Sequence, residues 1–469
     1  MRIPRVLVAG LSGGGGKTLV TVGLQAAWRR RGVRVAPFKK GPDYIDAAWS
    51  ASAAGRPCRN LDLFLLPPDV LLRSFGAGVA NADLAVIEGN RGLFDGADPR
   101  GSCSTAELAK LLATPVVLVV DCTKATRTVA ASVLGCQHMD PDVALRGVIL
   151  NRTAGTRHEA VVREAVRETT GLPVLGVLPR LSRQILPERH LGLVPPAEHD
   201  DRLDAVREAG EVVERWIDLD AVLDIARGAP RLDIPEADRA GPAGPESAAR
   251  IGVFRDAAFQ FYYPENLEAL TRAGARLTGI SPLRDPELPD VDGLYIGGGF
   301  PETLAAGLAD NEAFRTSVRQ AAEAGLPIYA ECGGAIFLGE ALAFRGRTYP
   351  MAGVLPVRFA FHDRPQGHGY AVLETVAENP FFPLGAEVRG HEFHYTCMER
   401  GGAGTDAGDL TFAFRVKRGQ GFGGQRDGLC RRNVLAAYTH VHALAVEQWA
   451  PSLVQAAIRF RSRTRVEAG

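Results

Sequence analysis

The chain has 469 residues, with 54 basic and 54 acidic side chains and a formal net charge of zero. A chain of this length exceeds a single hydrophobic core, so we expect two domains of about 200 residues each. The even charge balance argues against a nucleic-acid partner, and the short apolar stretches argue against a membrane span.

The cysteines indicate a reducing setting. Seven of them are scattered along the chain, and no pair has Cys-x-x-Cys spacing. Such spacing argues against a structural metal site and a disulfide framework. The first residues lead directly into an apolar strand, from which we expect no signal peptide and a cytoplasmic protein.

The first half of the chain alternates short apolar runs with helical stretches. Strands are predicted at residues 6–9, 33–38, 84–87, 116–120, 147–150 and 174–177, and helices at residues 18–31, 106–112 and 157–169. This alternation predicts an α/β domain with a doubly wound parallel sheet, in three layers. Ligands of such sheets bind at the carboxyl ends of the strands.

A change of composition separates the two halves. Residues 233–249 are rich in proline, glycine and alanine, which is typical of a linker. A second α/β series begins at residue 251, with later strands at residues 293–296 and 328–330. We therefore expect domains at residues 1–232 and 250–469.

A glycine-rich loop follows the first strand and ends in Lys17 and Thr18. Backbone N–H groups of such a loop bind phosphates, the lysine reaches the β- and γ-phosphates, and the threonine hydroxyl reaches magnesium. The alternative is a glycine-rich turn with a chance Lys-Thr pair. The residues of this loop that we expect to bind ATP are Gly13, Gly14, Gly15, Gly16, Lys17 and Thr18.

Gly10 lies one residue farther from Gly16 than the commonest phosphate loop allows, and this longer form resembles dethiobiotin synthetase. Partition-type ATPases carry an extra lysine where this chain has Ser12.

Charged and amide side chains follow the later strands of the same domain. Hard carboxylate oxygens suit magnesium, so Asp43 and Glu88 are predicted metal ligands together with Thr18. Lys39 is predicted to neutralise a transferred phosphoryl group, and Asn151 to contact the adenine. The alternative for Asp43 and its neighbour Asp46 is that they cap turns, because Gly-Pro-Asp is turn chemistry.

A thiol follows an apolar strand in the second domain, where Cys332 precedes two glycines and an apolar helical run. At such an elbow the helix N-terminus favours the thiolate and lowers the cysteine pKa. His440, at the end of a later strand-like run, is the predicted base; the alternative is a structural histidine. The residues predicted to form an oxyanion hole are Gly298, Gly299 and Gly333.

Taken together, these motifs resemble the cobyrinate a,c-diamide synthase family over nearly the whole chain. The motifs that carry the resemblance are Phe38-Lys-Lys-Gly-Pro-Asp-Tyr-Ile-Asp46, Glu88-Gly-Asn-Arg-Gly-Leu-Phe-Asp-Gly96, Arg189-His-Leu-Gly-Leu193, Asp256-Ala-Ala-Phe-Gln-Phe-Tyr-Tyr-Pro-Glu-Asn266, Tyr329-Ala-Glu-Cys-Gly-Gly334, Gly390-His-Glu-Phe-His-Tyr395 and Tyr438-Thr-His-Val-His442. The resemblance implies a phosphate-loop synthetase domain followed by a class I glutamine amidotransferase domain. It also implies a Cys–His dyad without a third member, because His442 stands where the familiar triad has glutamate.

The activity implied by the resemblance is amidation of a tetrapyrrole polycarboxylate with ATP, magnesium and L-glutamine. The residues expected to contact the tetrapyrrole are Asp46, Asp95, Arg189, His190 and Tyr262. Cobyrinic acid, hydrogenobyrinic acid, sirohaem and nickel-sirohydrochlorin remain open as substrates, and a homodimer remains open as the assembly. The alternative from another class is a nucleotide-switch protein whose amidase domain is degenerate.

Overall fold

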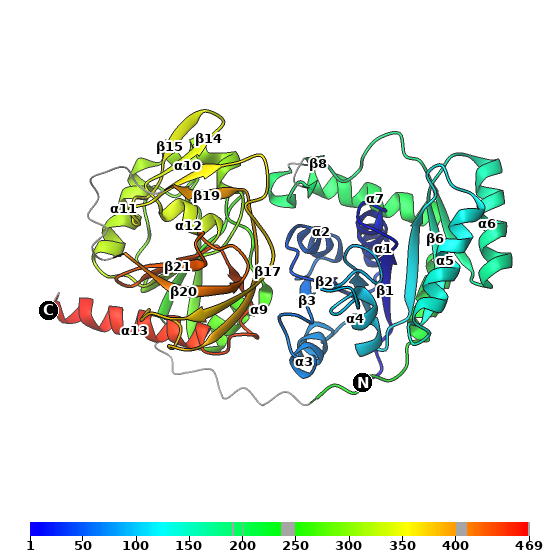
Figure 1. Cartoon of the computed structure of the whole chain (residues 1–469), viewed down its shortest axis with the longest axis horizontal. Coiled ribbons are helices and arrows are strands. Elements are labelled where there is room, and N and C mark those ends of the chain that lie inside the picture. Colours follow the sequence, from blue (N-terminus) through cyan, green and yellow to red (C-terminus); the bar gives the residue numbers. More distant parts are fainter. Residues whose placement is uncertain (190–191, 200, 236–248, 400–409, 468–469) are drawn as a thin grey trace. The chain divides into compact units, whose positions relative to one another are not determined.

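The computed structural model describes residues 1–189, 192–199, 201–235, 249–399 and 410–467 (Figure 1). The chain divides into two compact units, Met1–Ala237 and Asp238–Gly469, and the division falls within the predicted linker. No helix in the described ranges is long and apolar enough to cross a membrane.

The N-terminal unit alternates strands and helices. Its strands are β1 (Arg5–Gly10), β2 (Val35–Lys40), β3 (Arg59–Leu61), β4 (Leu84–Glu88), β5 (Val116–Asp121), β6 (Leu145–Thr153), β7 (Val174–Pro179), β8 (Glu188–Arg189) and β9 (Gly192–Leu193). Its helices are α1 (Lys17–Arg30), α2 (Ile45–Ala54), α3 (Pro68–Gly78), α4 (Thr105–Leu111), α5 (Arg127–Met139), α6 (Thr156–Thr170), η1 (Pro196–Glu198), α7 (Arg202–Trp216) and α8 (Leu219–Arg227).

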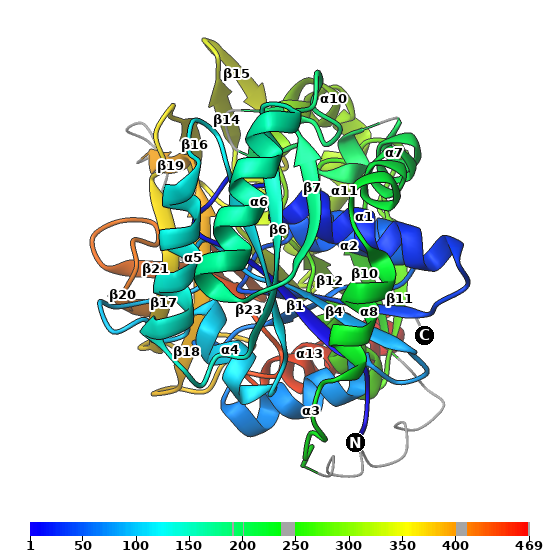
Figure 2. The ribbon, with the colours of Figure 1, turned by 90° about the vertical axis from the view of Figure 1, so that its right-hand side faces the viewer.

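A parallel sheet forms the middle layer of this unit. Among the described residues it has seven strands in the order β3-β2-β4-β1-β5-β6-β7. The six predicted strands are confirmed, and β3 is an addition that the sequence analysis missed. Every second residue of the central strands packs on α1, α7 and α8. The intervening residues, such as Leu7 and Leu118, are equally buried, so both faces are covered. Helices α5 and α6 lie side by side (Figure 2).

The C-terminal unit has a larger, mixed sheet. Its strands are β10 (Ala249–Phe254), β11 (Ala275–Ile280), β12 (Gly293–Ile296), β13 (Ile328–Glu331), β14 (Ala341–Phe344), β15 (Arg347–Pro350), β16 (Arg358–Phe361), β17 (Gly367–Thr375), β18 (Glu387–His394), β19 (Thr396–Glu399), β20 (Thr411–Arg418), β21 (Arg426–Arg431), β22 (Val434–Ala437) and β23 (His440–Val441). Its helices are α9 (Pro264–Arg272), η2 (Pro301–Leu304), α10 (Ala305–Asp310), α11 (Glu312–Glu323), α12 (Gly333–Leu338) and α13 (Trp449–Glu467).

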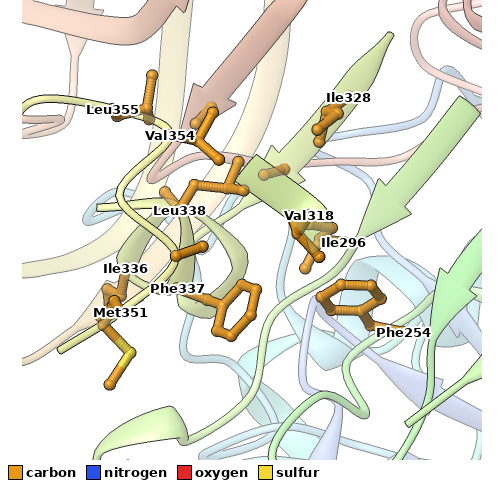
Figure 3. Close-up of a cluster of buried hydrophobic side chains, with 14 of the residues drawn as sticks. Phe254, Ile296, Val318, Ile328, Ile336, Phe337, Leu338, Met351, Val354 and Leu355 are labelled. Carbon is orange, nitrogen blue, oxygen red and sulfur yellow. The ribbon is translucent and has the colours of Figure 1, made fainter. Parts of the chain in front are cut away.

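The described part of the main sheet has the order β11-β10-β12-β13-β22-β21-β20-β17-β18-β23. Strands β11 to β22 of this order are parallel, and the remaining strands continue the sheet in antiparallel pairing. One face packs against α11 and α12, where Phe254, Ile296, Ile328 and Phe337 belong to one buried cluster (Figure 3). The other face packs against α9 and α13. This unit therefore also has three layers.

The contact between α1 and α7 depends on a glycine. A Cβ at Gly23 would lie 2.3 Å from Val213 Cγ2 and 2.6 Å from the carbonyl oxygen of Ala209. Gly135, on α5, is exposed, and a Cβ at that position would have no atom within 4 Å.

We expect Gly23→Ala to destabilise the N-terminal unit by about 1–3 kcal/mol, because backbone atoms of α7 must move. Gly135→Ala should instead stabilise it by about 0.5–1 kcal/mol through helix propensity. Thermal unfolding of the two full-length variants measures both effects. Equal shifts of the melting temperature would contradict the close packing of α1 and α7.

Candidate functional site

The glycine loop between β1 and α1 has the geometry of a phosphate-binding loop. Gly14 and Gly16 adopt left-handed conformations, with φ of 70° and 95°, which side chains other than glycine adopt at a cost. Lys17 begins α1, and its Nζ donates to the carbonyl oxygen of Ser12 at 2.8 Å. The lysine thus closes over its own loop. Burial lowers the pKa of Lys17, and the nearby charge of Lys39 lowers it further.

Asn151, at the end of β6, holds the same loop from the neighbouring part of the sheet. Its Nδ2 donates to the carbonyl oxygen of Gly15 at 3.0 Å, and its Oδ1 accepts from the N–H of Arg152 at 2.9 Å. A Cβ at Gly16 would lie 2.1 Å from that Nδ2. The side chain therefore shapes the loop, and both ends of its amide are engaged within the protein.

A buried lysine links two of the predicted carboxylates. Lys39 Nζ donates to Asp46 Oδ2 at 2.6 Å and to Glu88 Oε1 at 3.0 Å. The same Glu88 oxygen accepts from Thr18 Oγ1 at 2.7 Å. Lys39 and Glu88 meet because they are Cα partners on the parallel strands β2 and β4. The structure thus brings together four of the predicted N-terminal site residues.

The charges in this cluster depend on one another. Burial alone would lower the pKa of Lys39, but the carboxylates of Asp46, Glu88 and Asp43 outweigh it and hold that pKa above its usual value. Burial raises the pKa of Glu88, and the Lys39 ammonium opposes the rise. Burial and the charge of Asp46 likewise raise the pKa of Asp43. The ammonium therefore favours the ionised form of the buried carboxylates.

Asp43 and Asp95 each stabilise a turn. Asp43 Oδ1 accepts from the N–H of Asp46 at 2.9 Å, at the start of α2. Asp95 Oδ2 accepts from the N–H of Gly92 at 2.8 Å. The segment that contains Asp95 lies against the phosphate loop, because the N–H of Leu93 donates to the carbonyl oxygen of Gly10 at 2.8 Å. The turn-capping role that was the alternative for Asp43 is therefore present in the structure.

Glu88 and Thr18 fit a magnesium ion bound with a nucleotide. Glu88 Oε2 is buried and has no hydrogen-bond partner, while Oε1 accepts from Thr18. The described residues contain no group of three or more His, Cys, Asp or Glu side chains arranged to hold a metal. A cation here would take its remaining ligands from phosphate and water, as magnesium commonly does.

Of the three other predicted substrate residues, the structure describes the side chain of one. His190 lies outside the described residues, and Arg189 belongs to β8, where the structure describes only its backbone. Tyr262 lies in the C-terminal unit, where its hydroxyl donates to the carbonyl oxygen of Phe254 at 2.5 Å. That hydroxyl also accepts from the N–H of Gly297 at 2.8 Å. Tyr262 thus supports the glycine segment that follows β12.

Cys332 occupies a strained elbow between β13 and α12. Its φ of 46° and ψ of −100° lie outside the common regions for a residue with a side chain. Its N–H donates to the carbonyl oxygen of Ala437 on the adjacent strand at 2.7 Å. The sulfur lies 3.9 Å from the carbonyl oxygen of Phe393. Strain of this kind is typical of nucleophiles on strand-to-helix turns.

The expectation of a lowered thiol pKa was wrong for this state of the protein. Burial raises the pKa of Cys332 well above its usual value, and the charge of Glu302 raises it further. The N–H of Gly333 opposes these effects but does not overcome them. Helix α12 has only six residues, so its dipole is small. A neutral thiol at rest needs a base to become a nucleophile.

The glycines predicted to form an oxyanion hole lie close to both the thiol elbow and His440. A Cβ at Gly333 would lie 3.0 Å from the nitrogen of Gly299, and one at Gly298 would lie 2.4 Å from His440 Cε1. A Cβ at Gly299 would lie 2.0 Å from the carbonyl oxygen of Ala258, so only glycine fits there. The segment thus brings the backbone nitrogen of Gly299 close to the elbow that carries Cys332.

His440 is buried at the start of β23 and contacts a carboxylate that the sequence analysis missed. Its Nδ1 lies 3.4 Å from Glu331 Oε2, and its ring stacks on His391 with centroids 4.9 Å apart. Glu331 is the last residue of β13 and directly precedes Cys332. The signal that could have revealed it is strand periodicity, which puts Glu331 on the same face as Tyr329.

His442 has a different environment. Its Nδ1 accepts from the N–H of Leu444 at 3.3 Å, and its Nε2 lies 3.7 Å from Glu265 Oε2. Its ring packs on Tyr263, with centroids 4.7 Å apart. The two histidines of the same short segment are thus each paired with a different buried glutamate.

Comparison with known proteins identifies the two halves of the chain. Residues 6–194 match the family described as the CobQ/CobB/MinD/ParA nucleotide binding domain. Residues 250–448 match the family described as the CobB/CobQ-like glutamine amidotransferase domain. Solved structures with low similarity include a glutamine amidotransferase (22% identity, TM-score 0.33, covering 45% of this chain and 98% of that chain).

Curated relatives match over nearly their full lengths. The chain is 43% identical over 458 residues to the cobyrinate a,c-diamide synthase of Magnetococcus marinus, covering 97% of each protein. It is 42% identical over 460 residues to the enzyme of the same name from Archaeoglobus fulgidus, covering 98% of each. A third relative of this name, from Listeria innocua, is 40% identical over 441 residues, which is 93% of this chain and 96% of the relative. With its nucleotide-binding and amidotransferase halves in this order, the chain belongs to the cobyrinate a,c-diamide synthase family.

Proposed function

We propose that the protein is an ATP- and glutamine-dependent ligase that amidates the a and c acetate side chains of cobyrinic acid. One observation carries the proposal: the same chain holds a phosphate loop beside the Lys39 carboxylate cluster and a strained thiol elbow beside His440. The names of the relatives, which share about two fifths of their residues with this chain, support cobyrinate as the substrate. All seven cysteines are free, which agrees with a cytoplasmic enzyme.

The C-terminal unit would release ammonia from glutamine. His440 takes the proton of Cys332, and the sulfur attacks the side-chain amide carbon. The N–H groups of Gly299 and Gly333 stabilise the oxyanion, and His440 returns the proton to the leaving ammonia. Water then hydrolyses the thioester to glutamate and restores the thiol.

The N-terminal unit would activate the carboxylate. An oxygen of the substrate carboxylate attacks the γ-phosphorus of ATP, which gives an acyl phosphate and ADP. Ammonia then displaces inorganic phosphate from the acyl phosphate to give the amide. Lys17 and Lys39 stabilise the negative charge on the transferred phosphoryl group. Activation is necessary because a carboxylate is a poor electrophile and has no good leaving group.

Glu88 and Thr18 would hold the magnesium ion that accompanies ATP, and Asp43 is the third predicted ligand. The unpartnered Oε2 of Glu88 supports this assignment. When bound, the ion neutralises phosphate charge. Asp46 and Asp95 remain our proposed contacts to the tetrapyrrole carboxylates.

Substitutions in the two units should separate the two half-reactions. Cys332→Ala should lower glutamine-dependent amidation by about 1,000-fold or more, yet leave amidation with ammonium salts near the wild-type rate, because external ammonia bypasses the thiol.

Lys17→Ala should lower amidation about 100-fold with either nitrogen donor. Mass spectrometry of the cobyrinate products measures both. Near-normal ammonia-dependent synthesis by Lys17→Ala would refute the role of the loop.

The two histidines should differ in their effect on the thiol. His440→Ala should slow covalent labelling of Cys332 by a diazoketone analogue of glutamine about 100-fold or more, since a general base contributes that much. His442→Ala should keep labelling within about fivefold of wild type, provided that the variant folds. Loss of labelling in His442→Ala with retention in His440→Ala would reverse the assignment.

The magnesium assignment predicts a specific dependence. Glu88→Gln keeps the size of the side chain but removes its charge, so the magnesium concentration for half-maximal activity should rise roughly tenfold or more. Asp95→Asn should leave that concentration unchanged and alter the ratio of monoamide to diamide. Product analysis across a magnesium titration tests both variants. The division of roles fails if the two variants behave alike.

A further inference from the structure

The carboxylate of Glu331 is fully buried at the end of β13 and makes four polar contacts. Oε1 accepts from the hydroxyl of Tyr329 at 3.1 Å and from the N–H of Val441 at 3.1 Å. Oε2 accepts from the hydroxyl of Tyr295 at 3.3 Å and lies 3.4 Å from His440 Nδ1. Three neutral donors and one imidazole nitrogen thus surround a group that is costly to bury when ionised.

A strand pairing and a side-chain hydrogen bond hold the segment of His440 beside Glu331. Glu331 and Ala437 are Cα partners on β13 and β22, so the segment that leads to His440 starts beside the thiol elbow. The segment is also tied from the other side, because Asn266 Nδ2 donates to the carbonyl oxygen of Val441 at 2.9 Å. These contacts fix the ring of His440 relative to the carboxylate.

No carboxylate follows His440 at the spacing of the familiar triad, because His442 occupies that position. His442 is itself paired with another glutamate, Glu265, at 3.7 Å. Glu331 is therefore a carboxylate that contacts His440 in the structure, and it directly precedes the proposed nucleophile, Cys332.

We infer that Glu331 is the positioning residue of the glutaminase site. It has the role that the third residue of the familiar catalytic triad has in other glutamine amidotransferases. The inference rests on the glutamine-dependent activity proposed above. With Nδ1–H donated to Glu331, Nε2 of His440 keeps its lone pair and can accept the proton of Cys332. The buried carboxylate then stabilises the imidazolium that forms.

Glutamine at position 331 distinguishes this role from simple packing. A glutamine Oε1 can still accept from Tyr329 and from the N–H of Val441. Its amide N–H₂ would face His440 Nδ1 and donate to it, which moves the imidazole proton to Nε2, where it blocks proton transfer from the thiol. Glu331→Gln should therefore fold and bind glutamine but activate Cys332 poorly.

The matched control is Glu265→Gln. This change also neutralises a buried glutamate beside a histidine of the same segment, but that histidine is His442. Both variants are compared with the wild type as full-length proteins. The measurements are the maximal rate and the half-saturating concentration of Cys332 labelling by the diazoketone analogue of glutamine, and amidation of cobyrinic acid with ammonium salts.

We expect Glu331→Gln to lower the maximal labelling rate about 100-fold or more with little change in the half-saturating concentration, and to keep ammonia-dependent amidation. Glu265→Gln should label within about fivefold of wild type. Wild-type labelling by Glu331→Gln, or an equal loss in both variants, would overturn the positioning role and leave the proposed function intact. A wild-type protein that takes no label would instead overturn the thiol chemistry itself, and the role of Glu331 with it.

Discussion

The register of the parallel strands is the constraint on which both candidate sites depend. In the N-terminal sheet, Glu88 pairs with Lys39 on one side and with Val8 on the other, two residues before the end of β1. A slip of β2 by one residue would turn Lys39 to the opposite face of the sheet. Glu88 would then be a buried carboxylate without its cation, which typically costs several kcal/mol. Charge pairing and strand register therefore stabilise each other.

In the C-terminal unit, strand register also positions the residues of the candidate site, but these residues have different chemistry. The pairing of β13 with β22 sets Glu331 beside Ala437, and the N–H of Cys332 donates to the carbonyl oxygen of that alanine. On the far edge, β18 pairs with β23 and brings His391 opposite His440. The proposed nucleophile, Cys332, and the proposed base, His440, are thus fixed by backbone hydrogen bonds, which explains how a strained residue at position 332 is maintained.

Hydrophobic alternation predicted the parallel core well because buried strands are short apolar runs that are easy to recognise. It missed β3, which has three residues, and it missed the antiparallel strands β17 to β21. Exposed and half-buried residues interrupt the apolar pattern of β17, and the buried Asp427 and Gly428 interrupt that of β21. Strand-end placement predicted that Lys39, Asp46 and Glu88 lie near one another, as the structure shows, because parallel strands end at a common edge. It could not show that Asn151 clamps the phosphate loop, since that depends on a glycine with no Cβ at position 16.

The expectation of a lowered pKa for the Cys332 thiol was wrong for a physical reason. Sequence shows the glycines and the helix that favour a thiolate, but it does not show burial, and burial disfavours the charged form more strongly. A neutral, buried thiol reacts slowly with oxidants, which act on the thiolate. In the proposed mechanism the thiol loses its proton to His440 as it attacks glutamine, so the orientation of that ring matters more than the resting charge of the sulfur. A carboxylate one residue before the proposed nucleophile can orient the ring of His440 as directly as a carboxylate two residues after the base. The contact depends on which groups meet in space and not on their spacing in the chain.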